Sequence, residues 1–166
     1  MKEASKSATM FLTTVIGISL ISLAFAAQSG NVAFTAILSG DRTTDAGSTV
    51  VFDQLLTTIG EGFNTATGVF TAPKAGDYVF HVNALTQVNN RIYVDLYRND
   101  NYLVSIYAWS GAFTYDTASN VITQRLSKGD RVYLKARKPA YFYGQVGEVY
   151  TTFSGYITGL LFAPSV

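Results

Sequence analysis

The feature of this chain that most constrains its fold is the spacing of aromatic residues and glycines across residues 52–80. Near the end of that stretch, residues 76–85 alternate in polarity, so Tyr78 and Phe80 share one face while His81 lies on the other, because strand side chains alternate with period two. The face with Tyr78 and Phe80 is the one expected in a core. The stretch therefore predicts a half-buried β-strand.

The same pattern continues from residue 30 to the end of the chain. β-Branched and aromatic residues alternate with polar ones, and no segment has the 3.6-residue period of a helix. Turn-forming residues interrupt the pattern at 67–68, 98–101 and 127–130. Short antiparallel strands of this kind fit a two-sheet sandwich, and periodicity alone leaves a jelly roll and an immunoglobulin sandwich both open.

The aromatic and glycine spacing resembles the signature of the C1q globular head domain family, from which the chain departs at Thr58 and Val82. Further resemblances follow in order: an opening strand, a Gly-Asp hairpin and a closing strand. The resemblance implies an all-β, ten-stranded antiparallel jelly-roll sandwich (C1q/TNF-like). The signature positions expected in its core are Phe34, Phe52, Phe63, Phe70, Gly76, Tyr78, Phe80, Gly129, Asp130, Phe153 and Gly155.

The N-terminal segment has the features of a signal peptide. Residues 11–26 are uncharged, follow Lys2 and Lys6, and end in the small-residue pattern of Ala24 and Ala26. We therefore expect a signal peptide at 1–26, a short segment at 27–31 and a C1q-like globular domain at 32–166. A membrane anchor is the alternative, but the apolar run is shorter than the roughly 20 residues that a spanning helix needs.

Charge and cysteine content narrow the function further. The formal net charge of +1 falls to zero once Lys2, Lys6 and Glu3 are removed, so no basic surface for nucleic acid is expected. The chain has no cysteine, so a secreted domain would depend on its core and its partners for stability. His81 is the only histidine, and no catalytic motif accompanies it, so we expect no enzyme activity.

Calcium is the one cofactor that the resemblance raises. Several C1q-like proteins bind it with two aspartates, and Asp116 matches the second of them. Ala108 stands where the first would be and offers no side-chain oxygen. The calcium site is therefore expected to be missing or weakened, and no other cofactor is expected.

Two groups of aromatic residues predict contacts with partners. Tyr93, Tyr97, Tyr133 and Tyr156 fall on the non-core faces of their strands, where a monomer would expose large rings, so we expect them at a homotrimer interface. A loop at 137–143 predicts a ligand patch, with packing of the loop on its own domain as the alternative. The ligand residues would be Arg137, Lys138, Tyr141, Phe142 and Tyr143.

The resemblance implies a secreted, extracellular, non-enzymatic trimer that binds ligands. Soluble, lectin-like pattern recognition in innate immunity is the expected role, with microbial or host surface glycans as ligands. The alternatives are a signalling ligand for a cell-surface protein receptor and a structural component of extracellular matrix. Neither nucleic-acid binding nor stable membrane insertion is expected.

Overall fold

The computed structural model describes residues 30–160 of the protein. All the strands lie within residues 33–160, in one compact unit that begins at Val32. The predicted signal peptide, residues 1–26, lies outside the described residues. Among residues 30–160, no helix is long and apolar enough to cross a membrane.

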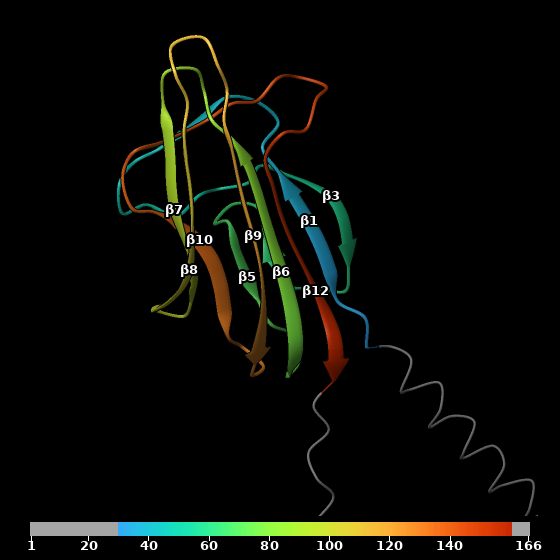
Figure 1. Ribbon diagram of the computed structural model, residues 1–166. Helices are drawn as coiled ribbons and strands as arrows, with labels where there is room; N and C mark the ends of the chain where they lie inside the picture. Colours follow the sequence, from blue (N-terminus) through green and yellow to red (C-terminus); the bar gives the residue numbers. More distant parts are fainter. Residues whose placement is uncertain (1–29, 161–166) are drawn as a thin grey trace, which may run out of the picture. The chain divides into compact units, whose positions relative to one another are not determined.

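Two five-stranded antiparallel sheets form the two layers of the fold (Figure 1). In spatial order, the first sheet contains β3 (Gln54–Ile59), β1 (Ala33–Ile37), β12 (Thr152–Leu160), β6 (Gly76–Leu85) and β9 (Thr117–Leu126). The second contains β4 (Phe63–Asn64), β5 (Val69–Thr71), β10 (Arg131–Ala136), β7 (Arg91–Arg98) and β8 (Asn101–Trp109). The predicted ten-stranded sandwich is confirmed.

A third, two-stranded sheet pairs β2 (Arg42–Thr44) with β11 (Ala140–Phe142). The sequence does not predict it, because each strand has only three residues and its partner lies far away in the chain. The pairing places residues 137–143 against the domain, with Phe142 only 1% exposed.

The core between the two sheets is built on aromatic rings. Phe34 lies among Phe63, Phe70 and Phe153, with ring centroids 4.7, 5.0 and 5.2 Å away. Phe63 is only partly buried. Rings at these separations add to the free energy of burial through their edge-to-face and offset contacts.

Other signature positions also lie in this core. Phe52, Tyr78, Phe80 and Phe153 are fully buried. Gly155 is buried where a Cβ atom would come within 2.6 to 2.8 Å of ring carbons of Phe34 and Phe80, so no larger residue fits without movement of the rings. The glycine of the closing strand is therefore a packing requirement.

Gly129 and Asp130, expected among the core residues, instead lie in the turn between β9 and β10. Gly129 is exposed and has a φ of 92°, a conformation that L side chains disfavour. The Asp130 carboxylate accepts hydrogen bonds from the Asn99 side chain at 3.0 Å and the Ser127 backbone N–H at 2.9 Å. Their role is to fix the turn and join it to the turn between β7 and β8.

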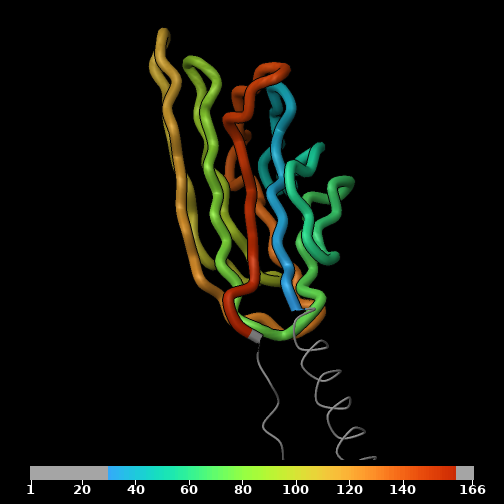
Figure 2. Tube along the Cα trace, turned by 90° about the vertical axis from the view of Figure 1, so that its right-hand side faces the viewer, coloured from blue at the N-terminus to red at the C-terminus, as the bar shows by residue number. Residues whose placement is uncertain are grey.

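The described chain enters and leaves at one end of the sandwich, and the loops 86–90, 110–116 and 143–151 lie at the other (Figure 2). We call this second end the apical end. Strand ends from both sheets meet there, so loops from distant parts of the sequence become neighbours.

Candidate functional site

On the outer face of the first sheet, the central rows of side chains are mostly apolar or hydroxyl-bearing and contain no Lys, Arg, Asp or Glu. Two rows of register partners cross the five strands here, and we call them the Tyr156 face: Ile59, Ala33, Tyr156, Val79 and Thr123, then Thr57, Thr35, Ser154, His81 and Val121. Val121, Ile59 and Tyr156 are 57%, 49% and 48% exposed. A contiguous exposed apolar surface of this kind is typical of an interface.

The charges at one end of the Tyr156 face neutralise each other. Arg125 donates two hydrogen bonds to the Asp77 carboxylate, at 2.8 and 3.0 Å. These hydrogen bonds hold the pKa of Asp77 below its ordinary value. The face therefore presents a matched ion pair at this border.

The outer face of the second sheet carries a different surface, which we call the tyrosine cluster: Tyr93, Tyr97, Tyr102, Tyr107 and Tyr133. Tyr97 stacks on Tyr133 with ring centroids 5.8 Å apart, and Tyr93 meets Tyr107 edge to face at 5.3 Å. Tyr133 is therefore covered and Tyr93 and Tyr97 are half-buried, whereas Tyr102 and Tyr107 remain 52% and 54% exposed.

Cationic side chains lie over the rings of the tyrosine cluster. The Arg137 guanidinium carbon is 4.5 Å from the Tyr93 ring centroid, and the Lys135 ammonium nitrogen is 6.0 Å from that of Tyr97. Contacts of this kind attract a cation to the electron-rich face of the ring. The positive charges of Arg137 and Lys135 are therefore partly used in contacts with rings of the same domain.

Asp95 is a buried carboxylate beside the tyrosine cluster, with only 2% of its surface exposed. Arg137 donates to both of its carboxylate oxygens, at 2.8 and 2.9 Å, and Ser105 donates a third hydrogen bond at 2.6 Å. The hydrogen bond to Asp95 raises the pKa of Arg137 above its ordinary value. Arg137 is therefore a structural residue of the second sheet.

The four tyrosines predicted at a trimer interface do not form one patch. Tyr156 lies on the first sheet and the other three on the second. Tyr133 is only 9% exposed, because Tyr97 covers its ring and its hydroxyl donates to the Asn99 carbonyl at 2.6 Å. The expectation that a monomer would expose Tyr133 is wrong, whereas Tyr156 is exposed as expected.

The predicted ligand loop is mostly packed on its own domain. Phe142 is buried in β11, so it has no surface for a ligand. The ring of Tyr143 contacts those of Tyr115 and Tyr150, with centroids 4.6 and 5.3 Å away. Lys138 remains exposed and Tyr141 half-buried. The alternative of packing on the domain describes this segment better than a free ligand loop.

Asp116 is already engaged by the backbone. Its carboxylate oxygens accept hydrogen bonds from the N–H groups of Trp109 at 3.1 Å and Thr117 at 2.9 Å. Ala108, at the position of the missing first aspartate, is 2% exposed within β8. Within residues 30–160, no group of three or more His, Cys, Asp or Glu side chains is placed to hold a metal ion.

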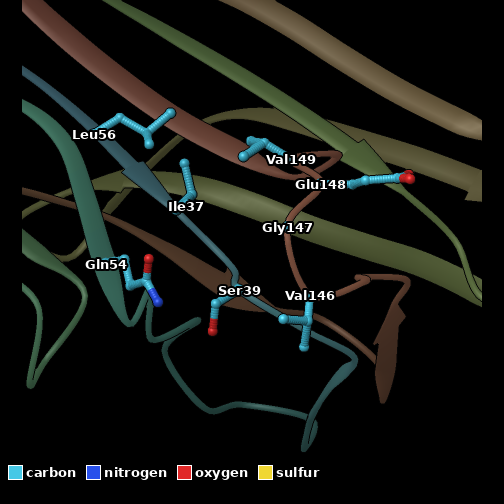
Figure 3. A pocket seen from close by; sticks show the side chains of 8 residues that line it. All are labelled: Ile37, Ser39, Gln54, Leu56, Val146, Gly147, Glu148 and Val149. Carbon is cyan, nitrogen blue, oxygen red and sulfur yellow. The ribbon is translucent and has the colours of Figure 1, made fainter.

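A groove of about 430 Å³ adjoins the Tyr156 face. In Figure 3, the side chains of Ile37, Leu56 and Val149 face a common space, while Glu148 points away from it. Ile37 follows Thr35 by two residues, so it belongs to the same side of the sheet. The groove extends the apolar surface of the Tyr156 face toward residues 146–149.

Part of the chain is similar to a curated protein of zebrafish. Caprin-2 of Danio rerio is 40% identical over 110 residues, which are 65% of this chain and 12% of caprin-2. The chain thus spans only about an eighth of that relative's length.

Solved structures of the same fold include both C1q and tumour necrosis factor domains. The globular domain of the zebrafish complement 1qA protein matches with a TM-score of 0.59 and 21% identity, covering 80% of this chain and 98% of that one. The Eiger TNF of S. frugiperda matches with a TM-score of 0.63 and 13% identity, covering 82% and 96%. Murine APRIL gives 0.60 and 14%, covering 76% and 98%.

The model of the C1q domain family matches residues 33–158, from the first strand almost to the end of the last. This range contains both sheets, the aromatic core and the turn with Gly129 and Asp130. The chain belongs to the C1q domain family.

Proposed function

We propose that this protein is a secreted, non-enzymatic homotrimer that recognises glycans on microbial or host surfaces. C1q/TNF-like domains form trimers and bind receptors or ligands. The observation that carries the proposal is the Tyr156 face, where Ile59, Tyr156 and Val121 stand exposed in rows that contain no Lys, Arg, Asp or Glu. Covering this face would remove their apolar surface from water.

A closed ring needs two different surfaces on each subunit, because each head-to-tail contact joins one patch to another. The Tyr156 face would provide one of them. The second is β8, the edge strand of the second sheet, where Tyr102 and Tyr107 are 52% and 54% exposed. Tyrosine is common at interfaces because its ring is apolar while its hydroxyl can keep a hydrogen-bond partner.

Trimerisation would present the apical loops in three copies. A sugar bound weakly by one subunit gains affinity when its neighbours on the same surface bind the other subunits, through the increased effective concentration. Soluble recognition of repetitive microbial or host glycans fits such a molecule. A soluble role in innate immunity is therefore part of the proposal, and it depends on the proposed assembly.

Binding to glycan-coated beads tests this function. The purified protein should bind a subset of glycan coatings saturably, and the free sugar should compete at much higher concentration than the coating. Saturable binding to cells that no sugar competes would favour a receptor-binding signalling ligand instead. Recovery of the protein only in insoluble extracellular material, without soluble binding, would favour a matrix component.

A further inference from the structure

A small pocket lies at the apical end beside Arg91 and Trp109, which are register partners where β7 begins and β8 ends. Its volume is about 250 Å³. Asn89, Asn90 and Tyr141 complete the lining. The pocket thus combines residues from three separate segments: the loop 86–90, the β7–β8 pair and the short strand β11.

Hydrogen bonds hold the frame of this pocket. The Asn89 backbone N–H donates to the Gly111 carbonyl at 2.9 Å, and the Ser110 N–H donates to the Asn90 carbonyl at 2.9 Å. The buried Ser110 hydroxyl donates to the Gln87 carbonyl at 2.6 Å. Asn89 has a φ of 59°, an uncommon conformation for a residue other than glycine. The two apical loops are therefore tied together, which lowers the entropy cost of ordering them around a ligand.

The lining side chains leave binding groups open to solvent. The Trp109 side chain is 71% exposed although its backbone is fixed. Among residues 30–160, three arginines form ion pairs with aspartates: Arg42, Arg125 and Arg137. Arg91 has no such partner in this part of the chain, and the pocket that it lines contains no carboxylate.

An indole face, a planar guanidinium and amide groups recognise different parts of one sugar. The indole packs on the C–H face of a pyranose ring, and the guanidinium donates a pair of hydrogen bonds that match a carboxylate. The Asn89 amide offers both donors and an acceptor to hydroxyl groups. A few polar groups around an apolar platform are typical of small-ligand sites.

We propose that this pocket binds a carboxylated pyranose, with the ring on Trp109 and the carboxylate on Arg91. The inference deepens the proposed glycan recognition and rests on it. It assigns the specificity to an acidic sugar residue. It places the site at the apical border of the tyrosine cluster, on the sheet opposite the one that carries the Tyr156 face.

Tryptophan fluorescence gives a direct test, because Trp109 is the only tryptophan in the chain. The probes are D-glucuronate and D-glucose, which differ only in the carboxylate at C6. Glucuronate should change the fluorescence of the wild-type protein with a half-saturation on the order of 1 mM, and glucose should bind about tenfold more weakly, since a charge-assisted hydrogen bond is worth about one factor of ten or more. Equal affinities for the two sugars would overturn the assignment of the carboxylate to Arg91.

Three variants separate the contributions of Arg91 and Trp109 to sugar binding, with affinities for glucuronate and glucose measured by calorimetry. Arg91→Gln should reduce the preference for glucuronate to about twofold or less, since the charged donor is lost. Trp109→Ala should weaken binding of both sugars. Phe113→Ala is the control, because Phe113 is 96% exposed in the neighbouring apical loop and does not line the pocket. It should bind like wild type, and a loss as large as that of Trp109→Ala would point to non-specific binding by exposed aromatic residues.

The glycan-coated beads distinguish this inference from the proposed function. If Arg91→Gln and Trp109→Ala bind acidic glycan coatings as tightly as wild type, the pocket is not the site although the glycan-binding function stands. If the wild-type protein binds none of the coatings, the proposed function itself fails.

Discussion

At the scale of single residues, the fold depends on rings that contact several others. Phe70 is 1% exposed, and its ring lies 5.0 Å from that of Phe34, 5.6 Å from Tyr78 and 5.7 Å from Phe80. Since the chain has no disulfide, this packing is not backed by a covalent cross-link.

Phe70→Ala should therefore lower the free energy of unfolding by about 3 to 5 kcal/mol, through lost burial and the cavity that remains. Urea unfolding followed by circular dichroism measures the change. Phe113→Ala is the matched control at an exposed phenylalanine and should stay within about 0.5 kcal/mol of wild type. An unchanged unfolding midpoint for Phe70→Ala would contradict the packing described for the core.

The two bidentate arginine–aspartate pairs differ in burial, and so should the cost of breaking them. Asp95 is 3% exposed at its side chain, whereas Asp77 is 33% exposed. Arg137→Gln would leave a buried carboxylate without its counter-charge, but Arg125→Gln leaves one that water can solvate. The midpoint of urea unfolding should fall clearly more for Arg137→Gln than for Arg125→Gln. Equal shifts for the two variants would contradict the structural role of Arg137.

At the scale of elements, the sequence predicts the strands and their buried sides better than it predicts the contacts between side chains on their outer faces. Alternation predicts the buried side of β6, because Tyr78 and Phe80 must leave water. It does not reveal that Tyr97 covers Tyr133, because that contact joins β7 to β10. For Val121, which is followed by Ile122, alternation is ambiguous because both are apolar.

The candidate site is predictable only in part, for the same reason. Tyr156 stands out as an aromatic on an outer face, but the residues around it come from five strands whose order the sequence does not state. Trp109 meets Arg91 and Tyr141 only through the register of β7 with β8 and the position of β11. Local patterns carry no information about such long-range neighbours.

The turn between β9 and β10 should make stability depend on pH. Hydrogen bonds from Asn99 and then from the Ser127 backbone, together with the charge of Arg98, hold the pKa of Asp130 below its ordinary value of 3.8. A carboxylate with a lowered pKa in the folded state stabilises the fold above pH 3.8, and that contribution is lost as the pH falls through the folded-state pKa.

Asp130→Asn should therefore be less stable than wild type at neutral pH, and the difference should shrink as the pH falls below about 4. Urea unfolding at a series of pH values measures both curves. If the stability curves of the two proteins stay parallel at pH values below about 4, the Asp130 carboxylate does not stabilise the fold through its lowered pKa.

At the scale of the whole molecule, secretion and assembly decide how the domain acts. The predicted cleavage after Ala26 places the mature N-terminus at Ala27 or within a few residues of it. N-terminal sequencing of protein recovered from culture medium measures this directly. An intact N-terminus in the membrane fraction would instead establish the anchor.

Assembly through the Tyr156 face is the central claim, since avidity and the threefold display of the apical pocket both depend on it. Tyr156→Asp places a charge in the middle of this face, where burial against a neighbour would leave it unpaired. Thr71→Asp is the matched control, because Thr71 is exposed on β5 of the second sheet, outside both proposed contact surfaces.

Sedimentation equilibrium at micromolar protein tests this claim most directly. The wild-type protein and Thr71→Asp should both have the mass of a trimer of the mature chain, and Tyr156→Asp should shift toward the monomer while its thermal unfolding stays cooperative. A monodisperse wild-type monomer, or a Tyr156→Asp variant that remains fully trimeric, would contradict the account.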